Sequence, residues 1–310
     1  MTSAKKSAAK DQLSLHSMLI FGTVLLIVFN IIPLIGNWMA FSKYKPQGDQ
    51  GFLQSLFSGE FVGFGFFKQI FNRPDFWNVL GNTVFISFVK IVLLIVFGVL
   101  LALMFNEMQH AHLKKAIQTI IFIPYFLSWT ILSTILIDLL SVDGVINALI
   151  TSTGHEAIPF LASNNWFTTV LFASEMWKSL GYQAIYFLAA CACINPTIYE
   201  AADIDGAGKF RQCISLTIPA LVPTIILMSV LNLGNIMSAG FDQIISLYNE
   251  LVYDTGDVLD TLSYRVGLIN PSTYQYSLGT AIGLFKSIIS CIFFAIGYYI
   301  AAKKFNYRIL

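Results

Sequence analysis

The chain has 310 residues, of which 56% are apolar and 11% are charged, and its formal net charge is +1. A soluble domain carries roughly a quarter charged residues. This composition and a mean hydropathy of +0.71 therefore exclude an ordinary water-soluble fold and indicate a chain surrounded by membrane lipid. The near-zero net charge says nothing about nucleic acid, but no run of lysine or arginine resembles a phosphate-binding arm, so no nucleic-acid partner is expected.

Six apolar stretches are long enough to cross a membrane, because about 20 apolar residues span the hydrocarbon as a helix. They are residues 18–41, 83–105, 117–140, 166–194, 220–239 and 277–302. The first stretch follows a basic segment, as in a signal peptide, but it is too long for one and no small-residue cleavage site follows it. We therefore expect a retained anchor and an all-α membrane protein with six transmembrane helices.

Basic residues are unevenly distributed between the predicted loops. If the N-terminus is cytoplasmic, the inner segments hold Lys5, Lys6, Lys10, Lys114, Lys115, Lys209, Arg211, Lys303, Lys304 and Arg308. The outer loops, although longer in total, hold only Lys43, Lys45, Lys68, Arg73 and Arg265. Cytoplasmic loops carry the excess of lysine and arginine, so both termini are expected in the cytoplasm.

The longest inner loop, residues 195–219, predicts a rigid knob. Pro196 can start a short helix there, and Gly206 and Gly208 can stop it in a left-handed turn. A second short helix is then expected to lead into Pro219. Two short helices with a bend between them suit mechanical coupling to a partner better than a flexible tether does.

The same loop carries a recognisable pattern: Glu-Ala-Ala, three residues, Gly, nine residues, then an aliphatic residue, one residue, an aliphatic residue and Pro. The matching positions are Glu200, Ala201, Ala202, Gly206, Leu216, Ile218 and Pro219. This pattern resembles the EAA loop of ABC importer permeases of the binding-protein-dependent type. The sequence Asp205-Gly206-Ala207, followed by Phe210, is similar to the oligosaccharide branch, and the resemblance covers about residues 13–310.

The resemblance implies a type I ABC importer architecture. The chain would be the permease subunit that forms the translocation path of an ATP-driven importer in a bacterial-type cytoplasmic membrane. An extracytoplasmic binding protein would deliver the solute, an oligosaccharide, and a second, different permease subunit would complete the pore. A separate ATPase subunit would bind ATP and Mg²⁺, so no cofactor is expected on this chain. The residues implied in ATPase coupling are Glu200, Ala201, Ala202, Asp205, Gly206, Ala207, Phe210 and Pro219.

The resemblance and the spans together predict a division of the chain. The predicted parts are a cytoplasmic stub at 1–16, the first span and outer loop at 17–82, a core permease domain at 83–302 with its coupling loop at 195–219, and a basic cytoplasmic tail at 303–310.

Catalytic and metal-binding motifs are missing from the sequence. Gly206-Ala207-Gly208-Lys209 is not a phosphate loop, because no glycine lies five residues before Gly208 and Phe210 replaces the serine or threonine. No zinc-hydrolase or nucleophile-elbow motif occurs, and the four histidines are scattered. We therefore expect a transport subunit that is not an enzyme and has no metal site.

Polar and aromatic residues inside the fourth and fifth spans are candidates for the solute path. Polar groups within a span are costly and tend to face the interior of a helix bundle, and the family uses these two spans for transport. Aromatic rings stack on sugars, and amides pair with hydroxyls. The candidates are Trp177, Tyr182, Tyr186, Ser229, Asn232 and Asn235. Ordinary helix packing remains the alternative for each of them.

Charged residues within the spans suggest two internal ion pairs. Glu175 and Lys178 lie three residues apart and can neutralise each other. Lys90 and Asp138 could form another pair.

Two other functions stay open. An ion-driven secondary transporter often shows inverted repeats and unpaired intramembrane acids, neither of which is evident here. An ABC permease for a solute other than a sugar is also compatible with the pattern.

The orientation can be tested by cysteine labelling from outside intact cells. Asp254→Cys should react with an impermeant maleimide, whereas Lys209→Cys should not, because the charge distribution places residues 195–217 in the cytoplasm. Labelling of Lys209→Cys in intact cells would overturn the orientation.

Overall fold

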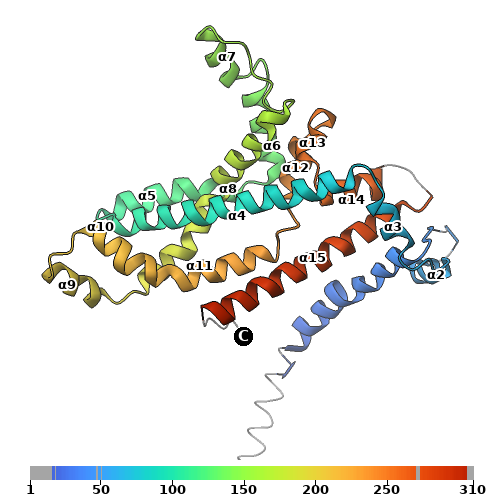
Figure 1. Ribbon diagram of the computed structural model, residues 1–310, viewed down its shortest axis with the longest axis horizontal. Helices are drawn as coiled ribbons and strands as arrows, with labels where there is room; N and C mark the ends of the chain where they lie inside the picture. The colour runs from blue at the N-terminus through green and yellow to red at the C-terminus, as the bar shows by residue number, and fades with distance from the viewer. Residues whose placement is uncertain (1–15, 18, 47, 50, 270–272, 306–310) are drawn as a thin grey trace, which may run out of the picture. The chain divides into compact units, whose positions relative to one another are not determined.

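The computed structural model describes residues 16–17, 19–46, 48–49, 51–269 and 273–305. These residues are helical apart from turns and one antiparallel bridge between Ser42 and Phe61 (Figure 1). They form two compact units, which are described separately. Unit one comprises Met1–Arg73 and Ser263–Leu284, and unit two comprises Pro74–Leu262 and Phe285–Leu310.

Five helical segments of the described chain are long and apolar enough to cross a membrane. They are Leu19–Phe41, Phe76–Glu107, Trp129–Ser152, Lys209–Leu233 and Gln275–Lys304. A sixth is obtained if α8 (Asn164–Ala192) and α9 (Pro196–Ile204), which meet at an angle of 70°, count as one bent span. The predicted all-α membrane architecture is confirmed, although several helices begin and end elsewhere than expected.

The other elements are shorter or subdivide these spans. In chain order they are η1 (Ile27–Ile31), η2 (Ile32–Phe41), α2 (Phe52–Ser58), α3 (Gly65–Phe71), α4 (Phe76–Glu107), α5 (Ala111–Phe122), η3 (Ile123–Phe126), α6 (Trp129–Leu140), α7 (Val145–Ser152), α10 (Lys209–Gln212), η4 (Cys213–Thr217), α11 (Ile218–Leu233), α12 (Phe241–Leu247), η5 (Glu250–Val252), α13 (Tyr253–Gly256), α14 (Leu259–Tyr264), η6 (Arg265–Ile269) and α15 (Gln275–Lys304).

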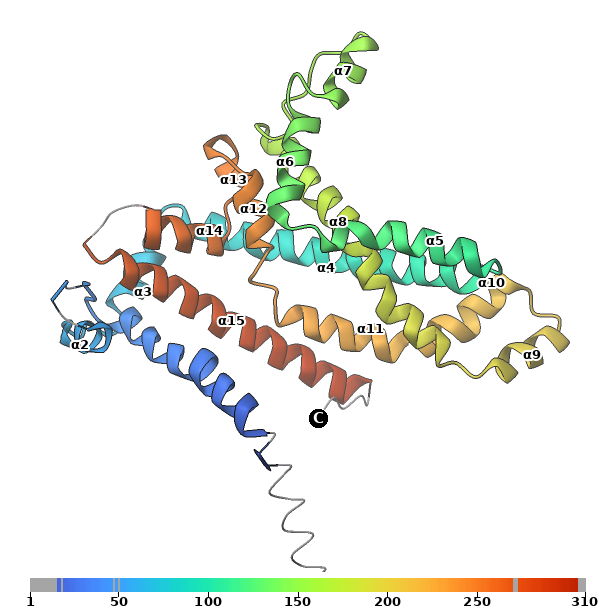
Figure 2. The same ribbon diagram turned by 180° about the vertical axis from the view of Figure 1, so that it is seen from behind.

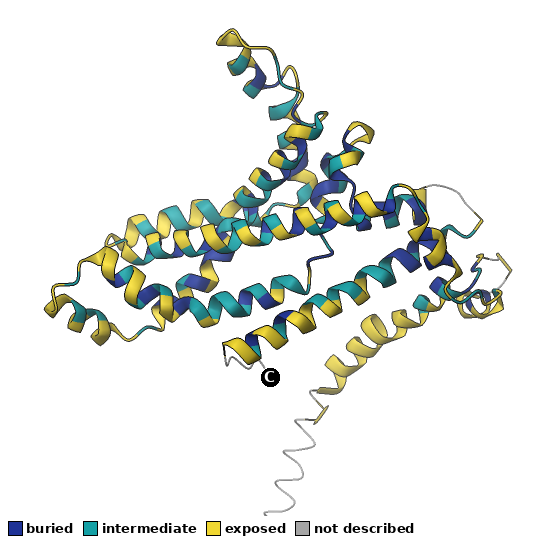
Figure 3. Cartoon of the chain, viewed as in Figure 1, coloured by how far each residue is buried: buried dark blue, intermediate teal, exposed yellow. Residues whose placement is uncertain are grey.

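Unit one holds the first span and the segment that follows it. The helix Leu19–Phe41 is apolar and exposed along nearly its whole length (Figure 3), as expected of a helix surrounded by lipid tails. Ser277 ties the chain after this helix to the start of α15: its hydroxyl accepts the Tyr44 N–H at 3.0 Å and donates to the Ser42 carbonyl at 2.8 Å.

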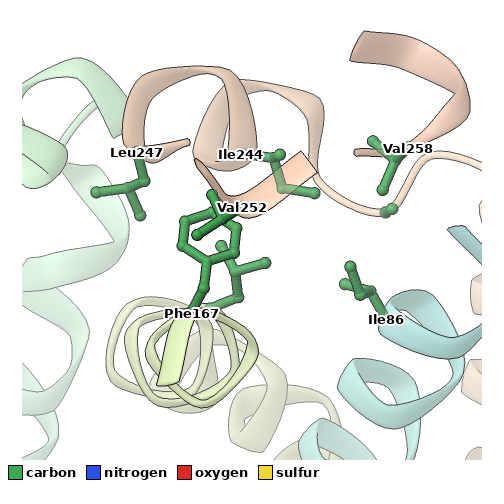
Figure 4. Close-up of a cluster of buried hydrophobic side chains, with 8 residues drawn as sticks. Ile86, Phe167, Ile244, Leu247, Val252 and Val258 are labelled. Carbon is green, nitrogen blue, oxygen red and sulfur yellow. The ribbon is translucent and has the colours of Figure 1, made fainter. Parts of the chain in front are cut away.

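The core of unit two is formed where α4 packs along α8. Gly98 on α4 permits this approach, because a Cβ atom there would lie 3.0 Å from Gln183 Cγ and 3.2 Å from the Phe187 ring. A buried apolar cluster joins α4 and α8 to α12 and the segment that follows it (Figure 4). Its members are Ile86, Phe167, Leu171, Ala239, Ile244, Leu247, Val252 and Val258.

The third predicted span, residues 117–140, is not one continuous helix. It is divided into α5, η3 and α6. Pro124 lacks an N–H and favours a break in the preceding helix, and Ser128 begins a new helix by accepting the Ile131 N–H on its hydroxyl at 3.3 Å. Hydropathy alone does not predict this break in the helix, because it does not depend on backbone geometry.

The fifth predicted span also differs from the structure. The sequence predicts it at residues 220–239, after a separate short helix. Instead α10, η4 and α11 form one continuous helical segment, Lys209–Leu233 (Figure 2). The segment ends at Gly234, and the chain then turns through Ala239 (φ 43°) and Gly240 (φ 87°), which ends the span six residues earlier than predicted.

A buried lysine organises this turn. Lys90 on α4 is 6% exposed, and its ammonium donates to the Ala239 carbonyl at 2.7 Å and to Gln243 Oε1. Gln243 Nε2 donates in turn to the Leu171 carbonyl and to Ser174 Oγ, both at 2.8 Å. The network therefore links α4, α8, α12 and the end of the fifth span.

Glu175 and Lys178 do not form the ion pair that their spacing suggests. Glu175 lies 3.7 Å from the Lys90 ammonium, so Lys90 pairs with Glu175 and not with Asp138. Lys178 instead donates to the Tyr125 carbonyl at 3.0 Å and to the Leu127 carbonyl. The break in the third span leaves these carbonyls without helical partners, and a lysine one helix away reaches them.

Lys90→Met should destabilise unit two strongly, because it leaves the Glu175 carboxylate and the Ala239 carbonyl without their buried cation. Breaking a buried pair from one side costs about 3 kcal/mol or more. Thermal unfolding of the purified protein in detergent measures this loss. Lys115→Met, at an exposed lysine, is the control, and equal melting temperatures for the two variants would contradict the assigned role.

Candidate functional site

The loop at residues 195–219 has a closed, rigid geometry. Asn195 caps α9 by accepting the Thr197 N–H on Oδ1 at 3.1 Å, with Pro196 at the first helical position. The helix ends in the expected left-handed turn at Gly206 (φ 72°), where the Ala207 N–H returns to the Ala202 carbonyl at 2.9 Å. Gly208 does not share that conformation: its backbone is extended (φ −65°, ψ 160°) and it caps α10.

Gln212 ties the two arms of this loop together. Its side chain is buried, and Nε2 donates to Asp203 Oδ1 at 2.5 Å and to the Ala207 carbonyl at 2.8 Å. Tyr199 and Thr217 share a hydrogen bond of 2.9 Å between their hydroxyls. The sequence analysis missed Gln212, since it lies outside the recognised pattern and its role depends on the folded turn.

The tip of the loop exposes apolar side chains. Ile204 is 88% exposed and Phe210 is 80% exposed, one on each side of the Gly206 turn. The predicted coupling residues Glu200, Ala201, Asp205, Gly206 and Pro219 are also exposed, whereas Ala202 and Ala207 are half-buried. A rigid knob with an apolar tip is well suited to insert into a groove on another protein.

The predicted path residues on α8 form part of an aromatic group. The Tyr186 hydroxyl donates to the Tyr182 hydroxyl at 2.6 Å, and their rings meet edge to face with centroids 5.3 Å apart. Tyr125 stacks on Tyr182 with a centroid distance of 4.0 Å and an interplanar angle of 6°. The Lys178 ammonium lies 5.7 Å from the centroid of the Tyr125 ring and 5.4 Å from that of Trp129.

Tyr125 was missed by the sequence analysis. It is brought to α8 by the break in the third span, and the signal that could have revealed it is the proline immediately before it.

The other predicted path residues lie apart from these tyrosines. On α11, Ser229 donates to the Ile225 carbonyl at 2.7 Å, and Asn232 is half-buried. Asn235 lies beyond the end of α11 and is exposed. Trp177 lines an apolar groove of about 290 Å³ with residues of α6 and α8. In the described residues no hydrogen bond or ring contact joins the α8 tyrosines to the polar residues of α11.

Lys286 and Asp260 form a second feature that the sequence analysis missed. The Lys286 ammonium, within the apolar helix α15, donates to the two carboxylate oxygens of Asp260 at 2.6 and 2.8 Å. An ionisable residue inside a membrane span is by itself a signal of function.

Comparison with known proteins decides the family. No family model matches the chain. The protein LplB of Bacillus subtilis is 39% identical over 301 residues, which cover 97% of this chain and 92% of LplB. The polygalacturonan/rhamnogalacturonan transport system permease protein YteP of the same organism is 34% identical over 297 residues, covering 96% of this chain and 89% of YteP.

A solved structure shows the same fold. A chain of the bacterial alginate ABC transporter, crystallised with an alginate pentasaccharide-bound periplasmic protein, superposes with a TM-score of 0.86 at 31% identity, covering 98% of this chain and 99% of that chain. The chain belongs to the permease subunits of carbohydrate ABC importers. The resemblance given by the EAA pattern is confirmed.

In this fold, the loop at residues 195–219 connects the two helices that carry most of the predicted path residues. The knob follows α8 and leads without interruption into α11, so it lies between the two helices that hold the predicted path residues.

Proposed function

We propose that this permease transports an oligosaccharide inward, in a complex with a second permease chain and a separate ATPase that binds ATP and Mg²⁺. An extracytoplasmic binding protein delivers the sugar. The names of the polygalacturonan/rhamnogalacturonan relative and of the alginate transporter support an oligosaccharide substrate, and the periplasmic protein of the latter supports a delivery partner.

The knob of residues 195–219 is the proposed ATPase contact, on the cytoplasmic side. The single observation that carries this proposal is its internal bracing by Gln212 combined with the apolar tip formed by Ile204 and Phe210. A braced element moves as a body when its partner moves, so closure of the ATPase dimer would be transmitted into α11 and switch the bundle between two states.

The aromatic group of Tyr125, Tyr182 and Tyr186 is the proposed sugar-contacting surface, together with Asn232 on α11. Tyr182 lies about 18 residues into the 29 residues of α8, roughly 27 Å along that helix and within its middle third. Stacked rings offer flat apolar faces to a sugar, and the linked hydroxyls offer donors and acceptors.

Uptake into proteoliposomes tests the proposal as a whole. The complete complex should accumulate an oligosaccharide only when ATP is hydrolysed, and ionophores that collapse ion gradients should have no effect. The panel is trigalacturonate, a rhamnogalacturonan tetrasaccharide and maltotriose. Uptake that follows an ion gradient without ATP would overturn the proposal in favour of secondary transport.

The coupling role predicts that Glu200→Lys and Gly206→Pro insert normally but lose ATPase association and transport. The first substitution reverses an exposed charge on the knob. The second forces a negative φ where the backbone has φ 72°. Co-purification of the ATPase and ATP-dependent uptake are the measurements. The matched glycine control is Gly208→Ala, at a negative φ with open space around a Cβ. Normal transport by both test variants would exclude the loop as the coupling element.

The path role predicts that Tyr182→Ala and Asn232→Ala each slow transport about fivefold, since a lost hydrogen bond or stacking face costs on the order of 1 kcal/mol. ATPase assembly should remain intact. Tyr182→Phe keeps the ring and removes the hydrogen bond to Tyr186, so it distinguishes the contribution of the ring from that of the hydroxyl. The control is Phe97→Leu, at an exposed position on α4. If the control is as slow as the alanine variants, their effect is one of packing and the path lies elsewhere.

A further inference from the structure

A groove of about 440 Å³ lies where α11 ends, against the part of α15 that belongs to unit two. Its walls include Gly234, Ser238, Lys286, Ser290, Cys291 and Phe294. This volume falls within the range of small-molecule sites. The groove is distinct from the tyrosine group on α8, with which it shares no lining residue.

The early end of α11 creates this groove. Gly234 lies against Phe294, and a Cβ atom there would be 3.3 Å from the Phe294 ring. The chain beyond Gly234 leaves the helix axis towards Ala239, whose carbonyl is held by Lys90. Ser238 is therefore placed in the groove by the same buried network that ends the span.

One lining residue of the groove, Lys286, belongs to an ion pair and keeps hydrogen-bonding capacity. Its ammonium gives two of its three N–H groups to Asp260, and each side chain remains about one-fifth exposed (21% and 19%). Asp260 does not itself line the groove, so the pair offers a ligand there the remaining N–H of Lys286. The hydroxyls of Ser238 and Ser290 make no hydrogen bond within the described part of the chain.

An aromatic ring lies on the same wall of the groove as Lys286. Phe294, eight residues after Lys286 on α15, is 37% exposed and supplies a flat apolar face. A ring face together with an ammonium and two hydroxyls is chemistry that suits a sugar, since its C–H groups pack on the ring and its hydroxyls both donate and accept.

The charge of the groove limits which sugar unit it accepts. The ammonium and the carboxylate neutralise each other, and a ligand carboxylate would compete with Asp260 for Lys286 at close range. Like charges at such distances repel. A ligand hydroxyl, in contrast, can accept the remaining N–H of Lys286 without separating the pair.

We propose that this groove binds one uncharged sugar unit of the transported oligosaccharide and that Asp260 and Lys286 determine this specificity. The inference rests on the proposed function and adds to it a second contact point and a preference for neutral units. It applies even to a mixed oligosaccharide, in which the groove would select the neutral residue.

Cys291 is a natural reporter for this site, because it is exposed and lines the groove. In the complete reconstituted complex, Cys191→Ala, Cys193→Ser and Cys213→Ser leave Cys291 as the reactive thiol of this chain. Its modification by a methanethiosulfonate reagent is followed by mass spectrometry. The rhamnogalacturonan tetrasaccharide or maltotriose should slow it several-fold, and trigalacturonate should not. A variant that retains Cys193, exposed at the end of α8, should react at the same rate with or without sugar.

Absence of protection by both sugars that contain neutral units would overturn the proposal, as would equal protection by trigalacturonate. ATP-dependent uptake by the wild-type complex is measured in parallel. Uptake without protection contradicts the groove alone, whereas absence of uptake of the whole panel contradicts the proposed function and the groove with it.

Exchanging the charges of Asp260 and Lys286 distinguishes a role in sugar recognition from a purely structural role. Asp260→Lys combined with Lys286→Asp preserves an ion pair but reverses its donors and acceptors. We expect it to retain the melting temperature of the wild type and lose uptake several-fold, together with Cys291 protection. Full recovery of uptake in the exchange variant, when Asp260→Asn alone is impaired, would show that the pair serves only to join α14 to α15.

Discussion

The buried ammonium of Lys90 is the constraint on which unit two depends. An unpaired charge in an apolar interior is strongly unfavourable, so the groups around Lys90 are held in one arrangement: the Glu175 carboxylate, the Ala239 carbonyl and the Gln243 amide. Those groups come from α8, from the turn after α11 and from α12. The lysine thereby holds the turn that follows the fifth span, next to the start of α12.

The fifth span consequently has two different ends. At one end, the knob is braced by Gln212 and exposes Ile204 and Phe210. At the other, the span stops at Gly234, next to a turn that contains the left-handed residues Ala239 and Gly240. The helical segment Lys209–Leu233 contains the π-helical stretch η4 and, within α11, Pro223. In the proposed coupling, a displacement of the knob would pass to α11 through this segment.

Local patterns in the sequence were sufficient for the apolar spans and for the left-handed turn at Gly206, since both follow from a few neighbouring residues. Local patterns did not predict the contacts for which groups distant in the sequence compete. The spacing of Glu175 and Lys178 favours a pair on one helix, but the carbonyls exposed by the break after Pro124 take Lys178, and Glu175 turns to Lys90. Such choices depend on which helices meet, and no local pattern contains that information.

Lys90, Lys178 and Lys286 each lie within an apolar helix, and each cation is satisfied differently. Lys90 is enclosed by protein acceptors, and Lys178 caps the carbonyls of a broken helix beside two aromatic rings. Lys286 meets a single carboxylate and faces a groove. The first two have evident structural roles, because removing either leaves backbone carbonyls without a donor. Lys286 satisfies only Asp260, itself a charge that a purely structural contact between α14 and α15 would not need. A charged side chain that lies in a groove beside two hydroxyls and an aromatic ring is consistent with the proposed contact to a polar ligand.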